Sequence, residues 1–130
     1  MEIQKESYED TELKARDLYK AINRVWCLPL DAYVVFDRQG FHHLIVKKNI
    51  PRPKSERKRR FALLPYAQDI LKNPDTIISH KIKNIRKSQA DFWIFSGKTN
   101  DLHIKVVVRQ IGSGKKHFFS IYGKKQKSTP

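Results

Sequence analysis

The stretch "LHIKVVVRQIGSGKKHFFSIYG", residues 102–123, decides the fold class. Apolar and polar residues alternate along it, which is typical of β-strands that bury one face. The glycines of "GSG" at 112–114 predict a short hairpin link between two strands. Two earlier segments, "TIISHKIK" at 76–83 and "DFWIFSG" at 91–97, show the same strand-like pattern, so the period of two begins at residue 76. We therefore expect four successive antiparallel strands at the C-terminal end.

The N-terminal part has the period of a helix instead. Leu18, Ile22 and Val25 recur at helical spacing in "SYEDTELKARDLYKAINRVWC", residues 7–27, and Pro29 follows. Since proline cannot continue a helix, we expect this helix to end near residue 27.

The middle of the chain combines one strand with two helices. We expect a strand over Ala32–Phe36, a turn over 37–40 and a short helix within "FHHLIVKKN", residues 41–49. A second helix is expected from about 56 to 72, kinked or divided at Pro65. The fold class predicted is α+β, with N-terminal helices packed on a twisted, mainly antiparallel sheet of four to five strands.

Charge gives the strongest global signal. The chain of 130 residues has 27 Lys and Arg against 13 Asp and Glu, a net charge of +14. Residues 1–40 carry 6 basic and 8 acidic side chains, whereas residues 41–130 carry 21 and 5, a net +16. Such a field attracts polyanions, and nucleic acid is favoured because its phosphates repeat. A generally basic, soluble surface is the alternative. We expect no membrane partner, since no apolar run reaches the ~18–20 residues that span a bilayer.

The chain has a single cysteine, Cys27. One thiol cannot form an internal disulfide, and no Cys/His ligand set accompanies it, so we expect no metal site and no cofactor. A reducing, cytoplasmic location is the expected site of action, with Cys27 in the core.

The last two strands contain the first group of candidate residues. On regular strands, Ser120 and Tyr122 share a face with Lys116 and Phe118, while His117, Phe119 and Ile121 share the other. On the preceding strand, Arg109 belongs to the row opposite the wholly apolar one. Pairing Arg109 beside Ser120 and Tyr122 would bring together a guanidinium, a hydroxyl and a phenol. An ordinary solvent-exposed sheet face is the alternative.

The segment "FHHLIVKKN" contains the second group. A helical turn places His43 and Lys47 on one face at i,i+4 spacing. An imidazole exchanges protons near neutral pH, and a lysine stabilises phosphate charge. Because RNA supplies its own nucleophile, the 2′-hydroxyl, a ribonuclease needs only a base, an acid and cations. His42 competes with His43 for this role, and a polar surface histidine is the alternative interpretation.

The run "ERKRR" forms the third group. Arg57 to Arg60 fall in the first turns of a predicted helix, where cations oppose the macrodipole unless an anion binds there. We interpret the run as a set of contacts to the phosphate backbone of a nucleic acid. The alternative is a run of solvent-exposed charged residues.

The order of these segments is similar to that of a known family. "GFHHLIVKK", "ALLPYAQDILKNPD", "DFWIF", "KVVVRQIG" and "HFFSIYGKK" follow one another over about residues 30–125. Together they resemble the barnase–EndoU–colicin–RelE (BECR) ribonuclease superfamily, especially its phage- and toxin-associated, colicin D-like branch. In that branch the lysines precede the histidine, whereas here they follow it.

The resemblance implies metal-independent RNA cleavage that leaves a 2′,3′-cyclic phosphate. It makes His43 the general acid or base, Lys47 and Ser120 phosphate ligands, and Tyr122 a residue that stacks a base or positions the 2′-hydroxyl. Arg109 is added from the strand pattern. The expected RNA contacts are Lys48, Arg57, Arg59, Arg60, Lys116, His117 and Lys124.

The sequence thus predicts one BECR-like ribonuclease domain over 1–125, with an N-terminal helix in 1–30, a catalytic core in 31–125 and a flexible tail at 126–130. The predicted activity is that of a toxin-like endoribonuclease, with tRNA as one candidate substrate and an acidic antitoxin or immunity protein as the expected partner. The alternative is a non-catalytic basic module that binds RNA or DNA.

Overall fold

The structure is a computed structural model that describes residues 6–99 and 101–125. The predicted flexible tail, residues 126–130, lies outside the described residues. The helical elements are α1 (Tyr8–Ile22), η1 (Leu28–Leu30), α2 (Arg38–Ile45), α3 (Lys54–Leu63), η2 (Leu64–Tyr66) and α4 (Ala67–Lys72). The strands are β1 (Arg24–Cys27), β2 (Ala32–Val35), β3 (Val46–Lys47), β4 (Ile50–Pro51), β5 (Ile77–Ile85), β6 (Ser88–Lys98), β7 (Leu102–Ile111) and β8 (His117–Lys125).

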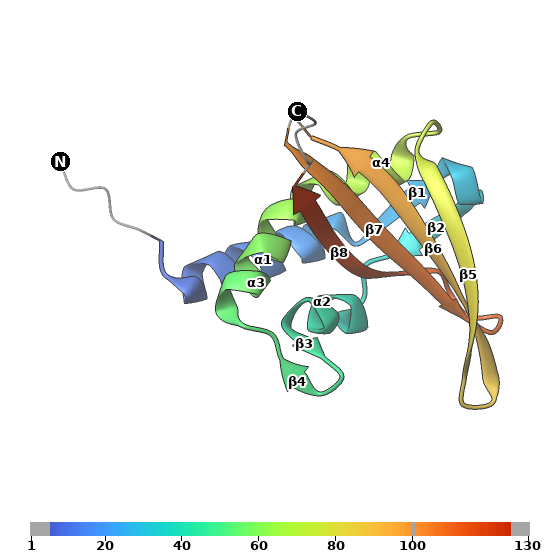
Figure 1. The fold of residues 1–130 in the computed structure, drawn as a ribbon, viewed down its shortest axis with the longest axis horizontal. Coiled ribbons are helices and arrows are strands. Elements are labelled where there is room, and N and C mark those ends of the chain that lie inside the picture. The colour runs from blue at the N-terminus through green and yellow to red at the C-terminus, as the bar shows by residue number, and fades with distance from the viewer. Residues whose placement is uncertain (1–5, 100, 126–130) are drawn as a thin grey trace.

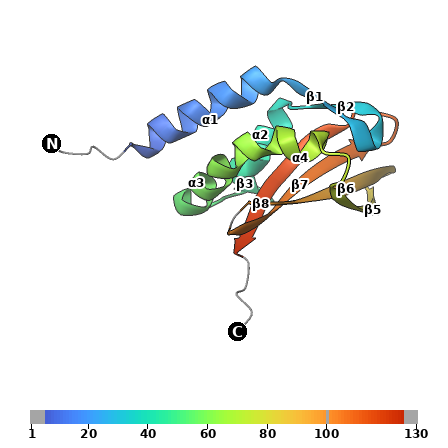
Figure 2. The same cartoon turned by 90° about the horizontal axis from the view of Figure 1, so that it is seen from above.

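A curled six-stranded sheet with the order β1-β2-β8-β7-β6-β5 forms one layer, and helices α1 to α4 form the other (Figures 1 and 2). The α+β class is therefore confirmed, and so are the four successive strands from β5 to β8. The predicted count of four to five strands is too low. The sheet is also mixed, because β2 pairs with β8 in parallel at Val35 and His117 while the other pairings are antiparallel.

The sixth strand comes from a segment that we assigned to the first helix. Helix α1 ends at Ile22, and Asn23 has φ 58°, a left-handed conformation in which the chain leaves the helix. Strand β1 follows, with Val25 and Cys27 buried as alternate residues. Helical spacing and strand alternation both fit these apolar positions, so the short strand could not be told from a helix end. The prediction of a buried Cys27 is confirmed.

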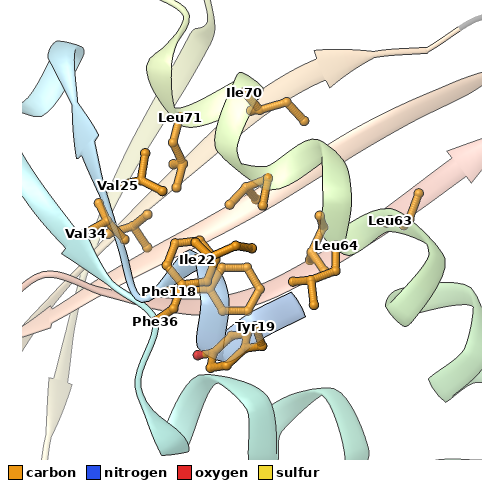
Figure 3. Close-up of a cluster of buried hydrophobic side chains, with 14 of the residues drawn as sticks. Tyr19, Ile22, Val25, Val34, Phe36, Leu63, Leu64, Ile70, Leu71 and Phe118 are labelled. Carbon is orange, nitrogen blue, oxygen red and sulfur yellow. The ribbon is translucent and has the colours of Figure 1, made fainter. Parts of the chain in front are cut away.

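The hydrophobic core lies between the two layers. Side chains from α1, α3, α4, β1, β2 and β8 meet there (Figure 3). Phe118 of β8 is fully buried and stacks on Phe36 with ring centroids 4.8 Å apart. Tyr19 of α1 packs edge-on against Phe118 and at a tilt against Phe36. This aromatic cluster attaches α1 to the sheet.

Helices α3 and α4 are separate, as Pro65 predicted. The 3₁₀ turn η2 contains this proline and connects them, and both helices bury their apolar residues, including Phe61 and Leu71. None of the helices in the described ranges is long and apolar enough to cross a membrane.

Helices cover the free edge of β8. Strand β2 reaches β8 only at His117, so the rest of β8 has no strand on that side in the described chain. Helix α2 packs there instead, with Gly40 against the Phe118 carbonyl, and Arg60 of α3 donates to the Ile121 carbonyl at 3.1 Å. Covering an edge in this way satisfies its backbone groups without another strand.

A β-bulge at Phe119 changes which β8 side chains face the helices. Val108 pairs with Phe118, but Val107 pairs with Ser120, so Phe119 is an extra residue. Both Phe118 and Ile121 consequently reach the core, three residues apart. The expected sharing of one face by Phe118, Ser120 and Tyr122 is therefore wrong.

The bulge has a simple cause. Neither set of alternate residues in β8 is wholly apolar, because one set contains Ser120 and the other His117. One inserted residue resolves this conflict. It places Ser120 opposite Val107, on the sheet face away from the helices, and leaves only apolar residues of β8 in the core.

The packing of Gly40 against β8 is open to a direct test. A Cβ atom added at Gly40 would lie too close to the Phe118 carbonyl and 2.5 Å from the Tyr19 hydroxyl. We expect Gly40→Ala to lower the free energy of unfolding by about 1–3 kcal/mol, the usual cost of overpacking. Helix propensity alone would raise it by about 1 kcal/mol. Urea denaturation measures the change. Arg38→Ala, an exposed change in the same helix, serves as the control, and a Gly40→Ala protein as stable as wild type would contradict the packing.

Candidate functional site

A basic depression of about 250 Å³ lies where α2, β3 and α3 meet the sheet face away from the helix layer. It is lined by His43, Lys47, Arg52, Arg60, Lys81, Lys83, Phe92, Ile94, Val107, Phe119, Ser120 and Tyr122. Histidine, lysine, serine and tyrosine from the two predicted groups are therefore in one place, although they lie far apart in the sequence. No acidic side chain is among the described residues that line it.

Arg52 holds His43 in position through the backbone. Its Nε donates to the His43 carbonyl at 3.0 Å, and its amide donates to the Ile45 carbonyl at 2.7 Å. A cation at the last carbonyls of α2 is favoured by the helix dipole. The ring of His43 packs on Phe119, with centroids 4.2 Å apart. The backbone and the ring of His43 are thus both fixed.

Lys47 reaches the depression by a different route from the one predicted. Helix α2 ends at Ile45, and Val46 is extended, so Lys47 belongs to strand β3 and not to the helical face of His43. A tight turn follows, in which Lys48 and Asn49 have φ 49° and 64°, and Lys47 pairs with Ile50 of β4. The hairpin, rather than i,i+4 spacing, places Lys47 beside the histidine.

The surroundings of His43 oppose its protonation. Burial is the largest cause, and together with the charges of Arg52, Arg60, Arg109 and Lys47 it lowers the pKa of His43 from 6.5 to about 4. The imidazole is therefore neutral near pH 7 in the free protein. A bound phosphate would offset these cations and raise the pKa.

Arg52, Glu56 and Arg60 form a charged network beside the histidine. One oxygen of Glu56 accepts from Arg52 at 3.0 Å and from Arg60 at 3.1 Å. Burial alone would raise the pKa of Glu56, but the hydrogen bonds and charges of the two arginines lower it overall. Burial and the neighbouring Arg52 lower the pKa of Arg60, although Glu56 opposes this. Two guanidinium groups share one carboxylate, so the network keeps a net positive charge toward the depression.

Arg60 also connects α3 to the hydroxyl residues of β8. One terminal nitrogen donates to Ser120 Oγ at 2.8 Å, and the guanidinium lies 6.0 Å from the centre of the Tyr122 ring. Ser120 is only 3% exposed, so this contact fixes its hydroxyl. Arg60, which was expected only to bind the RNA backbone, lies at the centre of the site.

Two buried side-chain nitrogen atoms have no hydrogen-bond partner among the described residues: Nδ1 of His43 and Nε of Arg60. Buried polar groups in proteins are nearly always paired, so these two atoms are exceptions. Both belong to residues that line the depression.

Arg109 lies elsewhere than predicted. It pairs with His117, not with Ser120 or Tyr122. Its Nε donates to His117 Nε2 at 2.9 Å, so His117 must carry its proton on Nδ1, which donates to Asp37 Oδ2 at 3.1 Å. The Arg109 guanidinium lies 4.5 Å from the centre of the Phe119 ring. Arg109 therefore acts on His43 through its charge, from behind Phe119.

The two adjacent histidines have different surroundings. His42 lines a separate cavity between α1 and α2, together with Arg16, Tyr19 and Phe41. The structure thus separates His42 from Ser120 and Tyr122 and brings His43 to them.

The other predicted RNA contacts are dispersed. Lys48 is at the tip of the β3–β4 turn, Lys116 lies over the Trp93 ring, and His117 is buried in its hydrogen bonds. Arg57 faces inward, with Nε donating to the Arg52 carbonyl at 2.8 Å and a terminal nitrogen donating to the Tyr8 hydroxyl at 3.1 Å. Arg59 and Lys124 line a neighbouring groove that shares Arg60 and Tyr122 with the depression.

Sequence reasoning missed Arg52, Lys81 and Lys83 as site residues. The alternation of Lys81 and Lys83 in β5 was a usable signal, because it places both on one face. Phe92 lies three residues from the fully buried Phe95, so on a regular strand its side chain faces the other side of the sheet. It could have been separated from the core on that ground. Arg52 gave no such signal, since it lies between Pro51 and Pro53, outside every predicted helix and strand.

A scan against protein-family models found no match, and neither the curated proteins nor the solved structures gave a significant match. The resemblance to the BECR superfamily therefore remains an expectation, and function must be argued from the site itself.

The low pKa of His43 predicts a pH dependence of stability. The unfolded chain binds a proton at His43 near pH 6.5, whereas the folded protein binds it only near pH 4. Between these values the unfolded state holds more protons, so the free energy of unfolding should rise with pH, by at most ~1.4 kcal/mol per unit. This contribution to the free energy of unfolding is complete above pH 6.5 and is lost as the pH falls toward 4.

Denaturation of the wild type and of His43→Gln over pH 4–7 measures this effect. The variant keeps every other titrating group, so the difference between the two slopes isolates His43. Equal slopes would show that the imidazole titrates normally in the folded protein.

Proposed function

We propose that this protein is a metal-independent endoribonuclease of toxin type. The observation that carries the proposal is the grouping of a neutral, partly buried imidazole, His43, with Ser120, Tyr122 and the cations Lys47 and Arg60 in one depression. Each group has a use in cleavage of RNA by its own 2′-hydroxyl, which requires a proton acceptor, a proton donor and positive charge around phosphorus. The BECR-like assignment of the α+β fold belongs to the same proposal.

In this reaction the neutral His43 imidazole takes the proton of the 2′-hydroxyl as the 2′-oxygen attacks phosphorus. The bond from phosphorus to the 5′-oxygen breaks, and the leaving oxygen takes a proton from the Lys47 ammonium or from water. The product carries a 2′,3′-cyclic phosphate. Arg60 and Lys47 stabilise the charge that develops on the phosphoryl oxygens, and Tyr122 positions the ribose.

The electrostatics of the site suit this order of events. Burial is the main cause of the low pKa of His43, and the lining cations Arg52, Arg60 and Lys47 add to it. A phosphodiester bound at these cations would offset their part of the shift, so the pKa of the imidazole would rise when substrate is present. A free histidine that remains neutral is ready to accept the proton.

A non-catalytic nucleic-acid-binding module is the second candidate. It is favoured by the hydrogen bond that already engages Ser120 with Arg60, and by the weak basicity of an imidazole with a pKa of about 4. Such a protein would bind RNA with a strong salt dependence and release no product. Either candidate has a basic surface that an acidic neutralising protein would fit, and tRNA stays one candidate ligand.

Neighbouring histidines provide a matched test. Purified wild-type protein in EDTA should cleave total RNA, with tRNA as a separate substrate, and leave 2′,3′-cyclic phosphate ends. His43→Ala should reduce the rate by about 100-fold or more, the usual contribution of a general acid–base group. His42→Ala should retain most of it, because His42 lines a different cavity.

Gel analysis of end-labelled RNA with all three proteins measures the effect. If the wild type cleaves no faster than His43→Ala, or if both variants lose activity equally, the enzymatic proposal is wrong. RNA binding that persists without cleavage would favour the binding module.

A further inference from the structure

Phe92 is the only one of the three aromatic residues of β6 that lines the depression. Phe95 is fully buried in the core. Trp93 packs against the core and stacks on His80, with ring centroids 5.1 Å apart and planes 6° apart. Phe92 has the opposite parity, pairs with Arg109 of β7 and faces away from the helices. A large apolar ring on this open face has no role in the core.

The second aromatic ring of the depression, Phe119, is already occupied. The centre of its ring lies 4.2 Å from the centre of the His43 ring and 4.5 Å from Cζ of Arg109. Phe92 packs edge-on against it, with ring centroids 5.6 Å apart. Phe119 therefore positions other groups. Lys81 of β5 and Arg109 of β7 are the cross-strand partners of Phe92, and the Lys83 ammonium lies 5.4 Å from the ring centre. A lysine on a flexible stem can move aside or remain beside an added ring.

The surroundings of Phe92 have the two features that single-stranded nucleic acid requires. Ile94 and Val107 extend an apolar floor beside the ring. Cations stand on both sides of this floor, with Lys81 and Lys83 of β5 on one side and the arginines of α3 and the preceding loop on the other. An aromatic ring between cations is the arrangement on which unpaired bases stack while phosphates are neutralised.

Stacking also favours an unpaired nucleotide, because a base can pack on the Phe92 ring only if one of its faces is free. Within a duplex both faces of each base are covered by its neighbours, so a duplex cannot place a base on Phe92. The site therefore selects against paired strands.

We propose that Phe92, with Lys81 and Lys83, is a base-stacking platform for one unpaired nucleotide adjacent to the phosphate held near His43. The ligand is single-stranded nucleic acid; that it is RNA rests on the proposed function. Phe92 determines specificity for single strands, and it has no part in proton transfer.

Binding to an uncleavable oligonucleotide tests this platform. A fluorescent 2′-O-methyl strand lacks the attacking hydroxyl, and it is measured by anisotropy alone and after annealing to its complement. Wild-type protein should bind the single strand at least about 10-fold more tightly than the duplex. Phe92→Leu should weaken single-strand binding by about 5- to 100-fold, the range expected for one lost stack, and leave duplex binding unchanged. Phe92→Trp should restore it.

Lysine variants provide a matched control for charge. Lys83 lies beside the Phe92 ring, whereas Lys87 is exposed at the turn between β5 and β6. Lys83→Met should weaken single-strand binding more than Lys87→Met does. Thermal unfolding of each variant confirms that it is folded, and the partial exposure of Phe92 makes its substitution tolerable.

The outcomes separate this inference from the proposed function. Single-strand binding that depends on Phe92, without cleavage of the unmodified RNA, would retain the platform and refute the enzyme. Cleavage that depends on His43 but proceeds equally in Phe92→Leu would retain the enzyme and refute the platform. Equal affinity of wild type and Phe92→Leu for the single strand, or equal affinity of wild type for single strand and duplex, overturns the platform.

Discussion

One extra residue in β8, Phe119, is the constraint on which the rest of the structure depends. The core needs both Phe118 and Ile121, and side chains three residues apart on a regular strand point to opposite faces. The bulge removes this conflict and places Ser120 and Tyr122 together on the side of His43. Beyond the bulge, Arg109 pairs with His117 and with neither hydroxyl residue. Packing of the core and assembly of the site thus have one common cause.

The free edge of β8 is the second feature that connects fold and site. Since β2 pairs with β8 only at His117, helices α2 and α3 close the rest of this edge. The C-terminal ends of these helices carry His43 and Arg60. Arg60 satisfies the Ile121 carbonyl and holds Ser120 with the same terminal nitrogen. Two arginines share Glu56, so closing the edge leaves an excess of positive charge beside His43. Burial, and after it this charge, lowers the pKa of His43 and keeps the imidazole neutral. A site of this kind attracts phosphate without presenting a competing carboxylate of its own.

Strong periodicity made most of the fold predictable. The long strands and the division of a helix at Pro65 followed from alternation and from backbone chemistry. Strand β1 was missed because four residues are too few to separate a strand from a helix end. The grouping of His43 with Ser120 and Tyr122 was predicted from residue types and resemblance, whereas the position of Arg109 could not be, because register depends on tertiary packing across the bulge. Arg52 is visible only in three dimensions, since its role is to bond the carbonyls that end α2.

The register of β8 against β7 tests the central claim most directly. Interstrand nuclear Overhauser contacts in the isotope-labelled protein should pair Val107 with Ser120 and Val108 with Phe118, and leave Phe119 without a partner on β7. The His43 ring should show contacts to the Phe119 ring in the same spectra. Pairing of Val107 with Phe119, and of Val106 with Ser120, would mean a regular strand without the bulge. Ser120 would then turn toward the helices, and the site as described would not exist.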